Sequence, residues 1–201
     1  MRSEKRDARM REIETAAYAV MAQHGYDGTS MLAVAKVAKA SNETMYRWYG
    51  DKVGLFESMV QANAAEVQTS LAAMVATASP PLETLRRIAP VLLTMLLGDR
   101  AIALNTAAAS DPSGTLGKAI AKGGRDTVLP LLEKLMTDSI NDGSLVPPRH
   151  GDIAALFMHL LVGDQQIRRV IGTMAAPSVR AIEMQASTAM AQFTALCAKQ
   201  G

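Results

Sequence analysis

The sequence predicts an all-α protein, and two features of its composition carry that prediction. Hydrophobic residues make up 49% of the 201 residues, yet aromatic residues make up only 4%. The apolar content comes instead from small or unbranched side chains, with 34 Ala and 13 Met. Such residues favour helices over strands. We therefore expect closely packed helices and no strand.

The same composition excludes several other classes of protein. This apolar content with a net charge of +2 is not typical of a disordered chain, and the single cysteine, Cys197, excludes a disulfide framework. No run reaches 18 apolar residues, and residues 1–7 lack the apolar core of a signal peptide. We expect a soluble, cytoplasmic protein that has no membrane partner.

Hydrophobic spacing, glycines and prolines divide the chain into about nine helices. The first has apolar residues at 3–4 spacing on one face and ends before Gly25. Pro130 predicts a kink in the seventh. The predicted helices cover residues 7–24, 30–39, 42–49, 52–78, 82–97, 100–110, 116–141, 152–174 and 178–199.

Positive charge and aromatic side chains gather in the first quarter of the chain. Residues 1–52 carry nine Lys or Arg against seven Asp or Glu, whereas residues 53–201 carry twelve of each. Six of the eight aromatic residues lie before residue 57. A positive excess of two is weak evidence of a nucleic-acid partner by itself. It does support a division into a domain of residues 1–52 and a second domain of residues 53–201.

Residues 28–52 predict two short helices that need support from the first helix. Thr29 or Ser30 is the N-cap of one, Ser41 is the N-cap of the other, and Lys39-Ala40 is the turn between them. Helices this short are not stable alone. The apolar face of the helix over residues 7–24 therefore has to hold both.

The second short helix has a buried face and an exposed face. Met45 and Tyr49 are four residues apart and are expected to face inward. Hydroxyls, backbone N–H groups and cations bind phosphates, and arginine or apolar groups read base edges. Side chains of these kinds spread over the outer faces, which suit a DNA duplex: Thr44, Tyr46, Arg47 and Trp48.

These residues carry a resemblance to a known family. The match begins at Ala16-Ala17, continues through residues 25–30 and 35–41, and is densest between Thr44 and Phe56. Here the sequence resembles the TetR family of bacterial transcriptional regulators. The resemblance implies a three-helix DNA-binding domain with a helix-turn-helix over about residues 30–49. It also implies an α-helical second domain that binds a small-molecule effector and forms a homodimer.

The resemblance also implies contacts with a double-stranded DNA operator. Thr29 and Ser30 would meet phosphate at the start of one short helix, and Lys52 would pair with a phosphate. Thr44 and Tyr46 would contact the DNA. The positions that vary in the family, where sequence preference would be set, are occupied by Asn42, Glu43, Arg47 and Trp48.

Two residues depart from the family pattern. Lys39 stands at the turn position that is usually glycine, so a residue with a Cβ must tolerate the turn or the turn must differ. Glu43 replaces a small residue near the start of the second short helix. Its carboxylate suits a helix N-terminus but repels phosphate. It either accepts a hydrogen bond from cytosine N4 or stays solvated.

Two other features near this helix have more than one interpretation. Trp48 either contacts DNA directly or packs on the edge of the domain. The basic N-terminal residues either follow phosphates or are simply solvated, and they are Arg2, Lys5, Arg6 and Arg9.

Broad apolar stripes on the last two predicted helices indicate a homodimer. The apolar residues recur at 3–4 spacing, and each stripe is broader than one supporting contact requires. Packing against a second copy would give a four-helix interface, with a glycine allowing close approach; in the alternative, both stripes serve only the monomer core. The residues expected at this interface are Ile153, Phe157, Leu160, Gly163, Ile167, Ile182, Ala186, Met190 and Phe193.

An effector pocket is expected among the fourth to eighth predicted helices, which lie between residues 52 and 174. Methionine-rich walls adapt to irregular hydrophobic ligands, which favours a bulky apolar or amphipathic small molecule in an apolar cavity with a few polar groups. The candidate lining residues are Met95, Asn105, Met136, Met158, His159, Gln165 and Gln166.

The sequence therefore predicts a ligand-responsive DNA-binding regulator, most often a repressor in this family. An enzyme is disfavoured because the three histidines lack metal-ligand spacing and Cys197 has no adjacent base; we expect no metal and no cofactor. Gly123-Gly124 is isolated and is not a phosphate-binding loop. A helical adaptor that binds only protein remains the main alternative.

Overall fold

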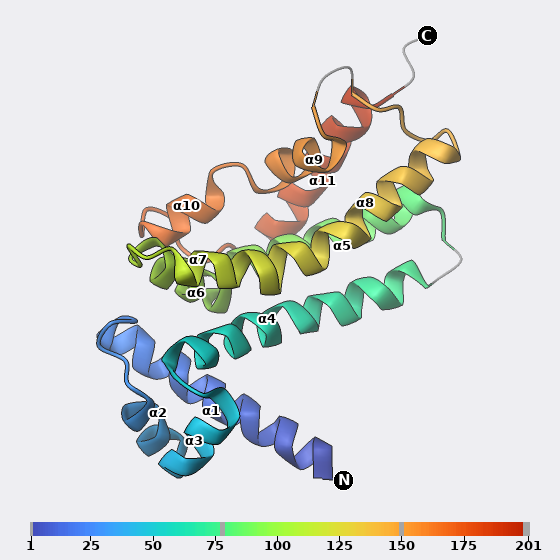
Figure 1. Cartoon of the computed structure of the whole chain (residues 1–201). Helices are drawn as coiled ribbons and strands as arrows, with labels where there is room; N and C mark the ends of the chain where they lie inside the picture. The colour runs from blue at the N-terminus through green and yellow to red at the C-terminus, as the bar shows by residue number, and fades with distance from the viewer. Residues whose placement is uncertain (1, 77–78, 149–150, 199–201) are drawn as a thin grey trace. The chain divides into compact units, whose positions relative to one another are not determined.

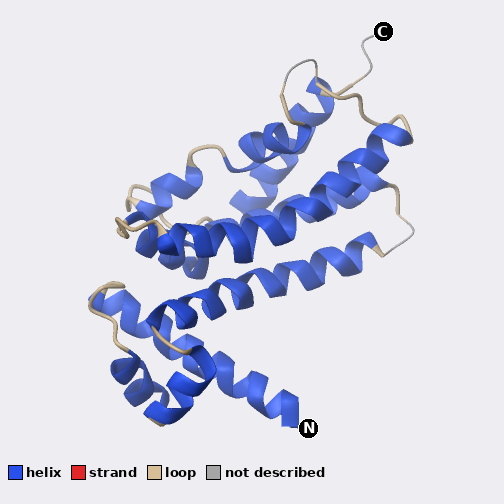
Figure 2. Ribbon diagram, in the orientation of Figure 1, coloured by secondary structure: helices blue, strands red, loops and turns tan. Residues whose placement is uncertain are grey.

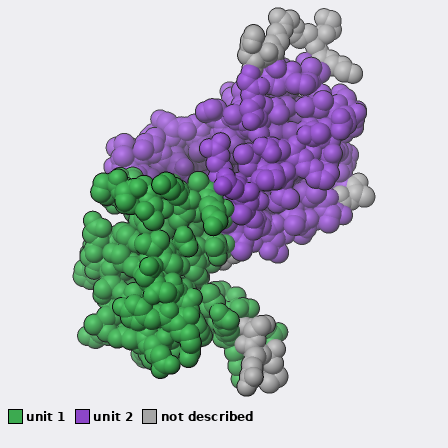
Figure 3. Space-filling model, in the orientation of Figure 1, with its two compact units in different colours: residues 1–62, 103–123 green, residues 63–102, 124–201 purple. Residues whose placement is uncertain are grey.

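The computed structural model describes residues 2–76, 79–148 and 151–198, with side chains for all of these except residues 2, 3 and 66. Within these ranges all regular secondary structure is helical (Figure 2), which confirms the predicted fold class. The chain forms two compact units (Figure 3). Unit 1 comprises residues 1–62 and 103–123, and unit 2 comprises residues 63–102 and 124–201.

Unit 1 is built from the first helices of the chain and a later segment. It contains α1 (Arg2–His24), α2 (Met31–Ala38), α3 (Asn42–Tyr49), the start of α4 (Lys52–Val75), the end of α6 (Asp99–Ala109) and α7 (Thr115–Ile120). α1 packs against α2, and α2 packs against α3. Figure 1 shows these helices in blue at the start of the chain. The first helix thus packs directly against α2, and α2 in turn packs against α3.

α1 begins at Arg2 and not near Asp7 as predicted. The prediction followed the apolar spacing, which starts only at Met10, but Glu, Lys and Arg are good helix formers even where they bury nothing. The basic N-terminal residues therefore lie on a helix.

The core of unit 1 extends past the predicted domain boundary at residue 52. Ile13, Val34 and Met45 are fully buried, and Phe56 packs edge-on against Tyr26 with ring centroids 5.6 Å apart. This core also includes buried residues from the start of α4 and from the segment 103–123: Leu55, Met59, Val60, Leu104, Ala107, Leu116 and Ala119. Unit 1 therefore combines the N-terminal residues 1–62 with the later segment 103–123.

Unit 2 is organised around α5 (Pro81–Leu97). This helix packs against α8 (Asp126–Asn141), α9 (Ile153–Val162), α10 (Gln165–Val170) and α11 (Val179–Leu196). One face of α5 is fully buried, including Leu85, Ile88 and Leu93, and the rings of Phe157 and Phe193 meet edge-on with centroids 5.4 Å apart.

Two of the predicted helices are divided. The helix expected over residues 152–174 ends at Gly163, whose φ of 54° and ψ of −132° are open to glycine, and α10 follows. The helix expected over residues 116–141 passes from α7 through a π-helical segment, Ala121–Arg125, into α8. This segment contains Gly123-Gly124, and it lies just before the kink predicted at Pro130.

Within the described residues, no single helix has both the length and the apolar character needed to cross a membrane. α5 and α6 have that length and apolar character only when they are taken together, and a bend separates them.

Candidate nucleic-acid interface

The N-termini of α2 and α3 are capped by serines. Ser30 Oγ accepts a hydrogen bond from the Ala33 N–H at 3.1 Å, and Ser41 Oγ accepts one from the Thr44 N–H at 3.1 Å. Ser41 also donates to the Thr44 hydroxyl at 2.9 Å. Of the two residues proposed as the cap of α2, Ser30 is therefore the one that serves. Both helix ends are fixed by side chains that lie at the surface.

Thr29 does not lie where a phosphate contact requires it. Its side chain is only 4% exposed, and its hydroxyl donates to the Gly25 carbonyl at 2.7 Å. This bond holds the loop between α1 and α2. The adjacent Ser30 is exposed, so of the two residues it is the one available to a phosphate.

α3 has the two faces that its spacing predicts. Met45 is fully buried and Tyr49 is 7% exposed, so both anchor the helix in the core of unit 1. Tyr46 is 57% exposed on the opposite side. Of the other predicted contacts, Asn42, Glu43 and Arg47 are exposed, whereas Thr44 and Trp48 are half-buried.

Glu43 and Arg47 form an ion pair one turn apart on this exposed face. Arg47 Nη1 lies 3.6 Å from Glu43 Oε1, and both side chains are largely exposed. Exposed pairs of this kind stabilise a helix little. The guanidinium can therefore exchange its carboxylate partner for a base or a phosphate at low cost. While Arg47 remains paired with it, the Glu43 carboxylate repels DNA less.

Trp48 packs beside the N-terminal part of α1. The guanidinium carbon of Arg6 lies 5.6 Å from the centroid of the Trp48 ring, within range of a cation–π interaction. This geometry favours packing at the domain edge for Trp48. It also gives Arg6 an aromatic neighbour on α3.

Lys52 ties the start of α4 to the loop before α2. Its Nζ donates to the carbonyls of Tyr26 at 3.0 Å and Asp27 at 3.4 Å, and it lies 4.2 Å from the centroid of the Tyr26 ring. An ammonium group has three donors. Two are used within the chain, so a phosphate would add to these contacts.

A buried carboxylate on α1, Glu14, lies near Tyr49 of α3, and no sequence pattern indicated it. Glu14 is 7% exposed and accepts a hydrogen bond from the Ser58 hydroxyl at 2.9 Å, which joins α1 to α4. The Tyr49 hydroxyl is buried and has no hydrogen-bond partner in the described part of the chain. Burial, and secondarily the charge of Glu14, raises the pKa of Tyr49 to about 12. Tyr49 therefore anchors α3 in its neutral form.

The residues predicted to line an effector pocket occupy different surroundings. Asn105 belongs to unit 1, and the other six to unit 2. Met136 is 1% exposed within the core, whereas Met95 and Met158 are partly buried against it and His159 is exposed. The amide of Gln166 donates to the Leu96 carbonyl at 3.0 Å, and that of Gln165 donates to the Val162 carbonyl at 3.2 Å.

Most of the residues predicted at the dimer interface belong to the core of a single chain. Gly163 ends α9, and its role there is conformational. Ile153 and Leu160 are half-buried, and Ile167 is 56% exposed. The remaining five side chains are at most 6% exposed in the single chain and pack in its core: Phe157, Ile182, Ala186, Met190 and Phe193.

Known proteins share both the N-terminal segment and the fold. Residues 13–59 match the family model described as bacterial regulatory proteins, tetR family. Residues 13–59 therefore have the sequence of a TetR-family N-terminal domain. The matched segment runs from α1 to the start of α4 and includes α2, the turn and α3.

Solved structures extend the TetR-family likeness over nearly the whole chain. A protein from Mesorhizobium loti assigned to the TetR family of transcriptional regulators is 25% identical, with a TM-score of 0.74 over 94% of this chain and 96% of that one. A TetR transcriptional regulator from Agrobacterium tumefaciens is also 25% identical, with a TM-score of 0.71 over 94% of each chain.

A third structure shares the TetR-family fold at lower identity. It is the transcriptional regulator FadR from Bacillus subtilis in complex with stearoyl-CoA, which is 15% identical, with a TM-score of 0.70 over 92% of this chain and 97% of that one. A search of the curated proteins found no match. The matched segment is that of bacterial regulatory proteins, and the fold is that of the TetR-family regulators to which the chain is similar.

Proposed function

We propose that this protein is a ligand-responsive transcriptional repressor. It binds a pseudo-palindromic operator as a homodimer in the bacterial cytoplasm, and a small apolar or amphipathic effector releases it. One observation carries the proposal: α3 presents an exposed polar and aromatic face from a TetR-family domain, while Met45 and Tyr49 anchor its other side.

The exposed face of α3 supplies groups suited to the major groove. Arg47 can read guanine and Asn42 can read adenine through paired hydrogen bonds. Tyr46 and the capped N-terminus of α3 can meet phosphates, because backbone N–H groups and the helix dipole favour anions there. Ser30 offers the same chemistry at the start of α2.

Exposed apolar side chains of unit 2 support association of two copies. Ile167 and Ile171 on and after α10 are 56% and 61% exposed. On α11, Val179, Met184 and Leu196 are 77%, 59% and 60% exposed. Two-fold symmetry would place two α3 helices on half-sites about 34 Å apart, or a multiple of that distance.

The nature of the effector is supported by ligands of two structural neighbours. The Bacillus subtilis FadR structure holds stearoyl-CoA, and a SmeT structure, 17% identical to this chain with a TM-score of 0.74, holds triclosan. Both ligands have large apolar parts. In this chain Met95 and Met158 are partly buried at the edge of the unit 2 core, where an apolar ligand could displace them.

DNA selection with the purified chain tests the proposal. A pool of random duplexes should yield one palindromic motif, and affinity for that motif should fall steeply between about 50 and about 200 mM salt. A protein-binding adaptor would yield no motif and no such salt dependence. Failure to enrich any motif would refute DNA recognition.

Effector binding is tested separately on the selected duplex. Long-chain acyl thioesters and apolar phenols should raise the melting temperature of the protein and release the duplex in fluorescence anisotropy. A ligand that raises the melting temperature without releasing DNA would contradict the proposed coupling.

A further inference from the structure

The turn between α2 and α3 adopts a conformation that its residue does not favour. Lys39 has φ 51° and ψ 40°, and among the described residues it is the one non-glycine residue with a positive φ. The Ala40 N–H donates to the Ala35 carbonyl at 2.9 Å, and the Lys39 N–H donates to the Lys36 carbonyl at 3.3 Å. These two bonds form a Schellman motif, in which glycine is usual at the position of Lys39. The Cβ of Lys39 makes the left-handed conformation unfavourable.

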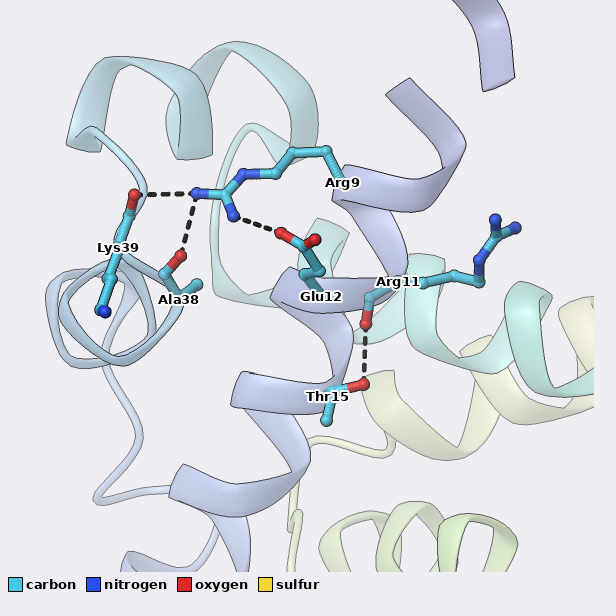
Figure 4. A network of polar contacts seen from close by, with 6 residues as sticks. All are labelled: Arg9, Arg11, Glu12, Thr15, Ala38 and Lys39. Atoms are coloured by element: carbon cyan, nitrogen blue, oxygen red, sulfur yellow. Dashed lines mark hydrogen bonds and ion pairs between the residues drawn. The ribbon is translucent and has the colours of Figure 1, made fainter. Parts of the chain in front are cut away.

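Arg9 reaches this turn from α1. Its Nη2 lies 2.9 Å from the Ala38 carbonyl oxygen and 2.8 Å from that of Lys39 (Figure 4). Its Nη1 donates to the Glu12 carboxylate, one turn along α1. The guanidinium is therefore fixed on one side by an acid and on the other by two backbone carbonyls.

These contacts offset the missing glycine in three ways. Carbonyls at the C-terminus of a helix lack donors within the helix, and Arg9 supplies donors to two of them. A cation at this end also suits the helix dipole. Hydrogen bonds from a charged donor are stronger than neutral ones, so they hold the Lys39 carbonyl in the orientation that the left-handed turn requires.

We infer that Arg9 is a positioning residue for DNA recognition. It locks the turn at Lys39 and so fixes the direction in which α3 leaves α2, because Ser41 and α3 follow directly. This inference rests on the proposed function. It concerns how α3 is presented and requires no contact between Arg9 and DNA.

The primary test compares two arginines of the same helix. Arg9→Ala removes the clamp, whereas Arg11→Ala removes the same charge from a side chain that points away from the turn (Figure 4). In fluorescence anisotropy with the selected duplex, at a temperature where circular dichroism shows each variant folded, Arg9→Ala should bind about tenfold more weakly, which corresponds to about 1.4 kcal/mol. Arg11→Ala should change affinity by less than about threefold, as expected for one exposed charge. Equal effects would overturn the inference.

A rescue experiment separates positioning of the turn from general support of the fold. Lys39→Gly removes the whole side chain, whereas Lys39→Ala removes the charge and the side chain beyond the Cβ but keeps the Cβ. The loss caused by Arg9→Ala should shrink to about twofold or less in the Lys39→Gly background and persist in the Lys39→Ala background, because only glycine relieves the turn. The same loss in both backgrounds would show that Arg9 does not act through the turn.

Amide hydrogen exchange tests the clamp without DNA. Arg9→Ala should speed exchange of the Lys39 and Ala40 amides, which form the Schellman bonds, and Lys39→Gly should restore their protection. Unchanged exchange in Arg9→Ala would overturn the inference even if DNA binding were lost. If the wild-type protein selected no DNA motif, the proposed function would fail while this measurement still decided whether Arg9 holds the turn.

Discussion

Replacing Lys52 with methionine should destabilise unit 1 as well as weaken DNA binding. Methionine keeps the length of the side chain and its packing on the Tyr26 ring but removes the ammonium group. The structure assigns that group two carbonyl contacts, at 3.0 and 3.4 Å, and a position 4.2 Å from the ring centroid of Tyr26.

The expected magnitude follows from those contacts. A hydrogen bond from a charged donor contributes about 1.5–3 kcal/mol and an exposed cation–π contact about 0.5–1 kcal/mol. Lys52 is half-buried, and methionine retains part of the packing, so we expect a net loss of about 1–2 kcal/mol. For a domain the size of unit 1 this lowers the melting temperature by roughly 4–16 °C.

Thermal unfolding followed by circular dichroism measures this loss, with Lys36→Met as the control. Lys36 is exposed on α2, and its replacement should cost less than about 0.5 kcal/mol. Identical melting temperatures for Lys52→Met, Lys36→Met and the wild type would show that the three contacts of Lys52 do not stabilise the fold. If the remaining N–H also binds a phosphate, Lys52→Met lowers the slope of log affinity against log salt by about 1.

Three further predictions concern the faces of α3 and α11. Tyr46→Ala should weaken operator binding by about tenfold in anisotropy with an unchanged melting temperature, because its ring is exposed; a matching loss of stability would contradict this. Phe193→Ala should lower the free energy of unfolding in urea by about 3–5 kcal/mol, since the ring is fully buried. Leu196 is 60% exposed, so Leu196→Glu should weaken dimerisation in sedimentation without that loss of stability. Equal losses of stability in the two variants would refute the distinction. Because the pKa of Tyr49 is raised from 10.0 to about 12, the folded state retains a proton that the unfolded state loses, so the free energy of unfolding falls as pH rises through this interval. Tyr49→Phe should reduce that fall, and an unchanged pH profile would argue against it.

The faces and caps of α3 could be predicted because local spacing determines them. Residues four apart lie on one side of a helix, which placed Met45 and Tyr49 in the core. A serine before a helix caps it whatever surrounds the domain, and Ser41 does so here. These are properties of eight or nine consecutive residues.

Other features depend on residues that are distant in the sequence. The Arg9 clamp joins positions 30 residues apart. The unusual residue at the turn, Lys39, could therefore be seen in the sequence, but the hydrogen bonds from Arg9 that stabilise the turn could not. Periodic apolar residues on α9 and α11 cannot distinguish a core within one chain from an interface between two. Phe157 and Phe193 contact each other in one copy. Of the two interpretations of these stripes, packing within one chain accounts for these two rings, and the dimer interface stays a prediction.

Unit 1 includes a segment that no linear division of the chain would assign to it. Asp111, in the loop between α6 and α7, accepts hydrogen bonds from the Leu116 N–H at 2.9 Å and from Ser113, which lower its pKa. Its charge also contributes, after burial, to the raised pKa of Tyr26, the residue that Lys52 contacts. The loop between α1 and α2 is therefore electrostatically linked to the segment between α6 and α7.

The chain passes between the two units at three places, and each lies within a helix. The crossings follow residues 62, 102 and 123, in α4, α6 and the π-helical segment Ala121–Arg125. α4 and α6 are regular helices, which transmit displacement along their axes, whereas π-helical turns often occur at functional sites. The chain therefore passes between the units through two regular helices and one π-helical segment with adjacent glycines. α4 leads directly to Lys52 and the loop before α2, and α6 leads to Asp111. Both segments meet at Tyr26, which Lys52 contacts and whose raised pKa is due in part to the charge of Asp111.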